Sequence, residues 1–159
     1  MTDVDGRRRE HPTRSRRRAG FVVAAWTLIV VLASVVDPAA ILGPAASDPA
    51  AQRVGSAGAV SVDSYTVAHL LAYGVLAWLV GVWLDFGSDN SNGVRTALVA
   101  VGVAAAVGFG VEILQVPVAA RAGSTTDAVV NVVGAVTGVT ARAAVRTVRT
   151  ARDGPRRGR

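Results

Sequence analysis

The chain has 159 residues, of which 51% are hydrophobic and only 18% are charged, and its mean hydropathy is +0.41. This mixture excludes an ordinary water-soluble domain, and the apolar residues are mostly Ala, Val and Leu, with small side chains that let membrane helices approach closely. The absence of cysteine excludes disulfides, thiolate metal sites and cysteine nucleophiles.

The positive charge is concentrated at the two ends of the chain. All 17 basic residues are arginines, with seven in 7–18 and seven in 142–159, and the net charge is +6. Basic tails that flank apolar spans are typical of membrane-protein termini held in the cytoplasm beside anionic headgroups. We therefore expect the lipid bilayer as a partner and expect no binding of nucleic acid.

Four apolar segments follow one another along the chain. They cover residues 19–36, 66–84, 96–120 and 127–145. Each is near the ~20 residues that cross a hydrocarbon layer of ~30 Å. The sequence therefore predicts an all-α, four-span transmembrane bundle over 19–145, between basic cytoplasmic tails at 1–18 and 146–159.

The distribution of arginine also predicts the topology of a multi-pass cell-membrane protein. Both tails lie in the cytoplasm only if the polar fourth segment crosses, because three spans would place one arginine cluster outside. The segments 37–65 and 119–126 are then external, and 85–95 is an internal turn. The first of these contains three prolines and is predicted to be irregular. A secretory signal is the alternative interpretation of the first span, and its removal leaves the other spans in the same orientation.

This topology gathers the polar residues of three spans at the outer end of the bundle. They are His69 and Tyr73 on the second span, Glu112 and Gln115 on the third, and Asp127 and Asn131 on the fourth, with Arg121 in the loop above. Each pair is spaced i,i+3 or i,i+4 and so shares one helix face. A charged side chain deep in a span costs about 2.5 to 3.5 kcal/mol, whereas one interhelical hydrogen bond returns about 0.6 to 2. Glu112 must therefore be protonated, paired with Arg121 or His69, or open to water, and it is a candidate site residue.

Structural roles are the alternative for most of these residues. Asp127 complements the positive N-terminus of a helix capped by Ser124 or Thr126. Asn131 and Gln115 act as interhelical hydrogen-bonding groups, and His69 and Tyr73 as interfacial anchors. The fourth span continues through Gly134 and Gly138, a spacing that permits close helix packing, and Ala100, Ala104 and Gly108 form a similar row before Glu112.

The ordered set of residues resembles the VanZ-like family of small membrane proteins. The matching pattern is His69-x-x-x-Tyr73, Glu112-x-x-Gln115, Arg121 six residues before Asp127, then Asp127-x-x-x-Asn131-x-x-Gly134-x-x-x-Gly138. It covers about residues 69–138. The chain departs from the family in the Asp-Lys that usually precedes the histidine, because Tyr65 and Thr66 stand there and Asp63 lies two residues earlier. The resemblance implies an envelope protein, with a link to glycopeptide (teicoplanin-type) resistance but no defined biochemical activity.

Three functions agree with this sequence. The first is binding of a lipid headgroup or another lipid-linked or anionic envelope ligand, without catalysis, by His69, Tyr73, Glu112, Gln115, Arg121, Asp127 and Asn131. The second is an enzyme for a lipid-linked substrate, with Glu112 and Asp127 as an acid/base pair and His69 as the base or as a metal ligand beside the acids. The third is a structural or partner-binding bundle. We favour the first, and the sequence points to no cofactor.

Overall fold

The computed structural model describes residues 10–35, 53–54, 62–86, 92–115 and 125–152. These ranges form four helices, α1 (Glu10–Val35), α3 (Ser64–Asp85), α4 (Gly93–Gln115) and α5 (Thr125–Arg152), and two short strands, β1 (Arg53–Val54) and β2 (Val62–Asp63). All four helices are long and apolar enough to cross a membrane. The predicted four-span, all-α transmembrane bundle is therefore confirmed.

The helix bounds differ from the predicted spans mainly at the two basic tails. α1 begins at Glu10 instead of residue 19, and α5 continues to Arg152 instead of 145, because helical structure extends past the apolar residues into the arginine-rich segments. Residues 116–120 of the predicted third span lie outside the described part. The predicted irregular connection is corrected at one place, where β1 and β2 form an antiparallel pair that joins Val54 to Val62.

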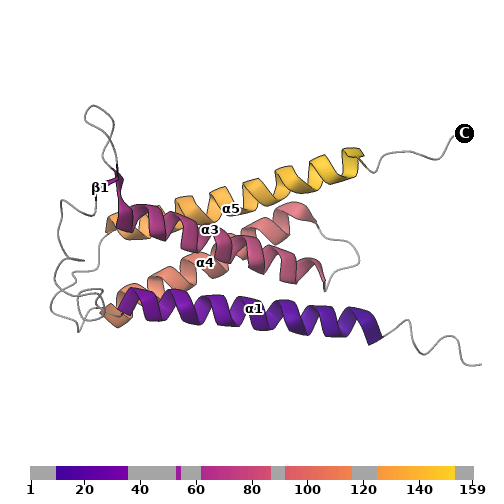
Figure 1. Cartoon of the computed structure of the whole chain (residues 1–159), viewed down its shortest axis with the longest axis horizontal. Helices are drawn as coiled ribbons and strands as arrows, with labels where there is room; N and C mark the ends of the chain where they lie inside the picture. The colour runs from indigo at the N-terminus through magenta and orange to yellow at the C-terminus, as the bar shows by residue number, and fades with distance from the viewer. Residues whose placement is uncertain (1–9, 36–52, 55–61, 87–91, 116–124, 153–159) are drawn as a thin grey trace, which may run out of the picture.

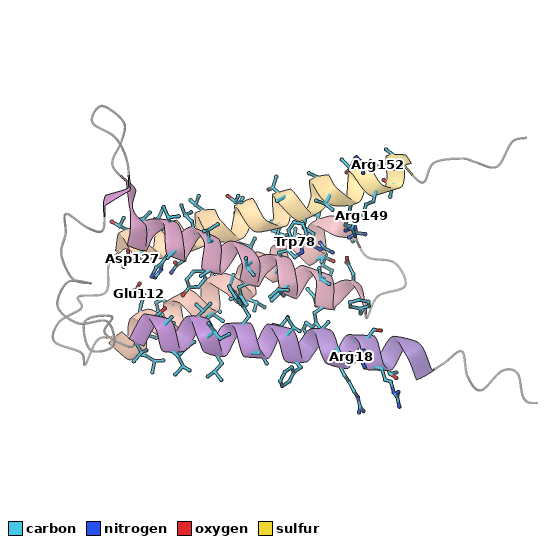
Figure 2. All side chains as sticks on the ribbon, viewed as in Figure 1. Arg18, Trp78, Glu112, Asp127, Arg149 and Arg152 are labelled. Carbon is cyan, nitrogen blue, oxygen red and sulfur yellow. The ribbon has the colours of Figure 1, made fainter. Side chains whose placement is uncertain are left out.

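Successive helices run in opposite directions, so α3 and α5 lie parallel while α1 and α4 run against them (Figure 1). α1 therefore begins at the end of the bundle where α5 finishes. Arg18, Arg149 and Arg152 lie at this end, whereas Glu112 and Asp127 lie at the opposite one (Figure 2). We name the two the arginine end and the carboxylate end. That the arginine end faces the cytoplasm remains a prediction from the charges.

Helix α4 begins with a side-chain cap that a turn sequence rich in Asn, Ser and Gly supplies. The side-chain oxygen of Asn92 accepts from the backbone N–H of Val94 at 3.2 Å, and its carbonyl accepts from the N–H of Thr96 at 3.0 Å. These bonds satisfy donors that the first helical turn otherwise leaves open. They fix the start of α4 at Gly93.

The interior is built from small side chains, while many large apolar ones face outward. Ala77, Ala100 and Ala104 are fully buried, together with Tyr73. Phe21, Leu71, Leu98 and Phe109 are among the large apolar residues that are more than half exposed, and they spread over α1, α3 and α4. In water this surface would be unfavourable, but in a bilayer lipid covers it, and small residues inside let the helices pack closely.

Helix α3 is the central element because it packs against each of the other three, and most extensively against α5. Gly74 on α3 meets Gly134 and Gly138 on α5. A Cβ atom at Gly134 would lie 2.5 Å from the carbonyl oxygen of Leu70, and one at Gly138 would overlap the carbonyl of Gly74. The two backbones are therefore in direct contact, which only glycine permits at these positions.

Helix α1 is attached to α3 by a specific hydrogen bond as well as by packing. The indole N–H of Trp26 donates to the backbone carbonyl of Ala72 at 3.0 Å. Val30 of α1 is buried against the core cluster that contains Tyr73 and Leu76. These contacts hold α1 beside the half of α3 that carries His69, and so they set one wall of the candidate site.

Candidate functional site

His69 and Asn131 form a direct hydrogen bond near the carboxylate end. Nδ1 of His69 lies 2.9 Å from Oδ1 of Asn131, and both side chains are buried. The amide oxygen is an acceptor, so Nδ1 carries a proton and donates it in this arrangement. Each residue lies about 8 to 9 Å along its helix from the first helical residue, at ~1.5 Å per residue. The parallel course of α3 and α5 is what brings the two to the same depth.

Tyr73 and Gly108 complete a junction of three helices around this pair. The rings of His69 and Tyr73 are 5.9 Å apart between centroids, and Tyr73 is fully buried. A Cβ atom at Gly108 of α4 would lie 3.0 Å from Nδ2 of Asn131 and 3.3 Å from Cε1 of Tyr73. Gly108 thus leaves room for both side chains. Of the row of small residues that leads to Glu112, Gly108 faces this junction, while Ala100 and Ala104 are buried earlier on α4.

The two carboxylates lie at the same end but outside the junction. Glu112 is one turn beyond Gly108, in the last turn of α4, and Asp127 is in the first turn of α5 (Figure 2). Both side chains are half-buried. Within the described residues, neither carboxylate forms an ion pair, and the two that occur both use Asp85. Asp127 stands where its charge complements the positive N-terminus of α5.

The structure therefore brings together only part of the predicted set. His69, Tyr73 and Asn131 are in contact, and Glu112 and Asp127 lie nearby without joining them. Arg121 lies outside the described residues, as does the side chain of Gln115. Gly134 and Gly138 do not line the junction. They lie on its arginine-end side, where they hold α5 against α3.

A cavity between α1 and α3 reaches the histidine. Its volume is about 170 Å³, and three polar side chains, Ser34, His69 and Tyr73, lie in its wall. The remaining wall is apolar and comes from Trp26, Ile29, Val30, Ala33, Ala68 and Ala72. Asn131 holds the ring of His69 from the side of α5, so the cavity has a fixed polar group on one wall. This combination suits a small polar group attached to an apolar molecule.

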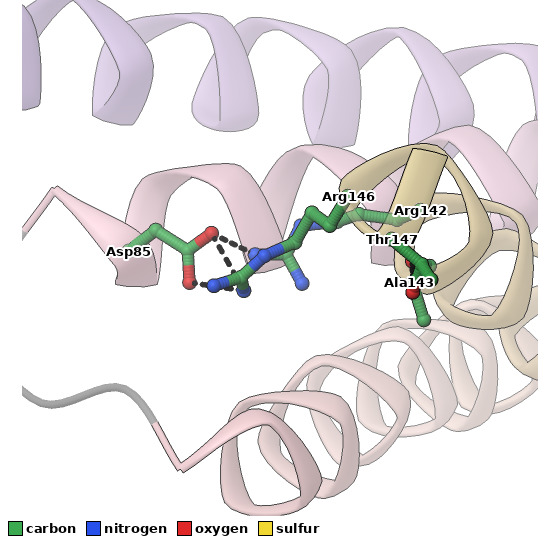
Figure 3. A network of polar contacts seen from close by, with 5 residues as sticks. All are labelled: Asp85, Arg142, Ala143, Arg146 and Thr147. Carbon is green, nitrogen blue, oxygen red and sulfur yellow. Dashed lines mark hydrogen bonds and ion pairs between the residues drawn. The ribbon is translucent and has the colours of Figure 1, made fainter. Parts of the chain in front are cut away.

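Sequence reasoning missed a second polar cluster, which lies at the arginine end. The guanidinium of Arg142 forms an ion pair with Oδ2 of Asp85, and Nη1 of Arg146 lies 3.2 Å from the same oxygen (Figure 3). Arg142 is buried with 5% of its surface exposed. It lies over Gly81, where a Cβ atom would be 3.0 Å from its Nε. The sequence prediction counts Arg142 with the C-terminal arginines, at the end of the fourth span, and places Asp85 in the internal turn, but it does not pair them.

A spacing in the sequence marks this second cluster. Arg142 follows Asn131 by eleven residues, close to three turns at ~3.6 residues per turn, so both lie on one face of α5. Gly134 and Gly138 lie on that face between them. The whole face packs against α3. An arginine on the same helix face as a buried asparagine and two packing glycines is therefore expected to be buried and to have a partner on the neighbouring helix.

No metal-binding group is found in the part of the chain that the structure describes, where three His, Cys, Asp or Glu side chains never gather. The hypothesis that His69 joins the acids as a metal ligand thus has no structural support there. His69 is held by the amide of Asn131. What the described residues provide is a cavity wall with one fixed polar group, His69.

Comparison with known proteins identifies no relative of this chain. No family model matches it, and neither a curated protein nor a solved structure shows a significant match. The assignment of function therefore depends on the chain's own residues and geometry.

Proposed function

We propose that this protein is a VanZ-like integral membrane protein of the cell envelope, which binds the polar headgroup of a lipid or lipid-linked envelope ligand at its carboxylate end, without chemistry of its own. The observation that carries the proposal is the cavity between α1 and α3, with His69 fixed in its wall by Asn131. The ordered pattern from His69 to Gly138 supports the family, and a link to teicoplanin-type resistance follows from that resemblance alone.

The size of the cavity limits what it holds. Its volume of about 170 Å³ is near that of an engineered cavity of about 150 Å³ that accepts a benzene-sized molecule. It therefore takes a headgroup, or a part of one, with the apolar portion of the ligand left in the bilayer. In this proposal Ser34 and His69 contact the bound group, and Arg121 meets an anionic group if the ligand carries one.

The main variant of the test fills the cavity without removing a polar group, and a second variant removes the polar ring of His69. Ala33 and Ala24 are both exposed residues of α1, but only Ala33 lines the cavity. Wild type, Ala33→Leu, Ala24→Leu and His69→Phe are purified in mild detergent, and the lipids and envelope precursors that copurify are identified by mass spectrometry. We expect one class of lipid or envelope precursor to copurify with wild type and Ala24→Leu and to be depleted in Ala33→Leu and His69→Phe.

One alternative has its own supporting observation, namely that the His69–Asn131 bond joins two helices and therefore stabilises the bundle. If His69→Phe lowers the melting temperature while Ala33→Leu changes neither the stability nor the copurified lipids, the junction is structural and the binding proposal is wrong. Equal lipid content in all four proteins leads to the same conclusion.

The proposed orientation is tested separately. The chain has no cysteine, so a single introduced thiol reports its own side of the membrane. We expect Ser47→Cys to react with an impermeant thiol reagent added to intact cells and Ser91→Cys to react only after lysis. The opposite pattern would place the carboxylate end in the cytoplasm.

A further inference from the structure

A cavity at the arginine end lies between the start of α1 and the end of α3, and no function assigned above uses it. Its volume is about 390 Å³, within the range of about 300 to 1,000 Å³ that is typical of ligand sites. It is lined by Thr13, Arg16, Arg17 and Gly20 of α1 and by Trp83 of α3. The four α1 positions are spaced i, i+3, i+4 and i+7, so they form one helix face.

Specific contacts define the wall that α3 contributes. The guanidinium carbon of Arg16 lies 5.7 Å from the ring centroid of Trp83, in cation–π geometry. A Cβ atom at Gly20 would lie 3.1 Å from Nε1 of Trp83. Glycine at position 20 therefore lets the indole approach α1, and the indole in turn positions one arginine at the edge of the cavity.

The ion pairs found among the described side chains do not include the arginines of this cavity. Both pairs join Asp85 to arginines of α5, and neither involves Arg16 or Arg17. The planar guanidinium group, with its fork of donors, is suited to phosphate oxygens. Two such groups on one helix face provide a binding surface for a phosphate.

The depth of the cavity favours a lipid over a soluble anion. The apolar part of α1 begins directly after Arg18, and α3 ends at Asp85, so the cavity lies at the level where the hydrocarbon of a bilayer gives way to headgroups. Tryptophan is enriched at this level of membrane proteins.

We propose that the cavity binds the phosphate headgroup of an anionic phospholipid, with Arg16 and Arg17 contacting the phosphate and Trp83 covering its glycerol side. The proposal does not depend on the proposed function, because it concerns the opposite end of the bundle.

The experiment compares two double variants with the same change in charge. Arg16→Gln/Arg17→Gln removes both cavity arginines, and Arg14→Gln/Arg18→Gln removes two arginines of the same helix that do not line the cavity. The proteins are incubated with equal amounts of phosphatidylglycerol and phosphatidylcholine in detergent, and bound lipid is counted by native mass spectrometry. Melting temperature in phosphatidylcholine alone verifies that both variants fold.

We expect wild type to bind phosphatidylglycerol preferentially and the cavity variant to lose this preference. The loss should approach thirty-fold, since each arginine near an anionic surface contributes roughly fivefold. The control variant should retain most of it. Equal losses in the two variants would show diffuse attraction to a basic helix and overturn the proposal, as would a wild type without preference.

A second arm distinguishes the lipid from free phosphate. Inorganic phosphate at millimolar concentration is added to the wild-type sample with both lipids present. We expect no displacement of phosphatidylglycerol, because the acyl chains hold the lipid in place. Complete displacement, with a thermal shift produced by phosphate alone, would assign the cavity to a soluble phosphate and contradict the lipid proposal.

Discussion

The two ends of the α3–α5 pair hold the same helices together by different chemistry. At the carboxylate end, a histidine and an amide share one hydrogen bond, and two half-buried carboxylates stand beside it without an ion pair in the described residues. At the arginine end, a buried arginine meets an aspartate inside the bundle. At the arginine end, α3 and α5 thus meet through an ion pair, whereas at the carboxylate end they meet through a hydrogen bond. The comparison assigns a structural role to the pair of Asp85 with Arg142, while under the proposed function the carboxylate end is the binding site.

The largest effect is expected from a substitution that pushes α3 and α5 apart and so disturbs both ends of this helix pair. Gly138→Leu places a side chain where the backbone of Gly74 already lies, so α3 and α5 must move apart. Overpacking of this kind costs on the order of 3 kcal/mol or more, because helix backbones do not yield as side chains do. We expect little folded protein in detergent, as measured by size-exclusion profile and thermal melting.

A glycine on the lipid-facing surface supplies the control. Gly102 of α4 is exposed, and a Cβ atom there meets nothing within 4 Å. Gly102→Leu should therefore melt close to the wild-type temperature. If it is as damaging as Gly138→Leu, helix propensity or insertion accounts for the loss, and the contact with Gly74 does not.

The next largest effect distinguishes the two ends, because one aspartate is substituted at each of them. Asp85→Asn leaves Arg142 buried without its anion, and we expect a loss of about 2 kcal/mol, below the usual 3 to 5 because Asp85 is 30% exposed. Asp127→Asn removes only a favourable helix-terminus charge, about 0.3 to 1 kcal/mol. Melting temperatures in one detergent compare them. Equal losses would mean that the carboxylate end also contains a structural charge.

The smallest effect concerns the coupling between His69 and Asn131. A double-mutant cycle with His69→Phe and Asn131→Leu should give a coupling energy of about 0.6 to 1.7 kcal/mol, the range found for interhelical hydrogen bonds in membranes. Single and double variants are compared by unfolding in detergent. A coupling near zero would show that the bond adds nothing to stability and that His69 is held there for another purpose.

The overall fold was predictable because it depends on local composition. Apolar length located the first three helices, so 66–84 was predicted where Ser64–Asp85 is helical. The polar fourth helix was predicted from the arginine tails, which require an even number of crossings. The shared end of His69, Glu112 and Asn131 followed from alternating helix directions. None of these inferences needed knowledge of which helix faces which.

The contacts themselves were not predictable in the same way. Which of the polar residues touch depends on the rotation of each helix about its axis, and that rotation is set by where α3 and α5 meet through their glycines. The ion pair of Asp85 with Arg142 was missed because a charge count treats every arginine near a terminus as exposed. The cavity at His69 depends on α1, whose second half, next to His69, has few polar residues to indicate its partner.

The buried face of α5 also has a consequence for biosynthesis. α5 is the last of the four described helices to leave the ribosome, and its apolar window has the lowest mean hydropathy among them. Its Asn131 and Arg142 both find partners on α3. An unpartnered arginine costs about 2.5 to 3.5 kcal/mol on insertion at the centre of a span and less toward its end, where Arg142 lies, and a helix already in the bilayer offsets that cost. We therefore expect α5 to enter the membrane against α3, so that the order in which the chain is synthesised becomes part of how it folds.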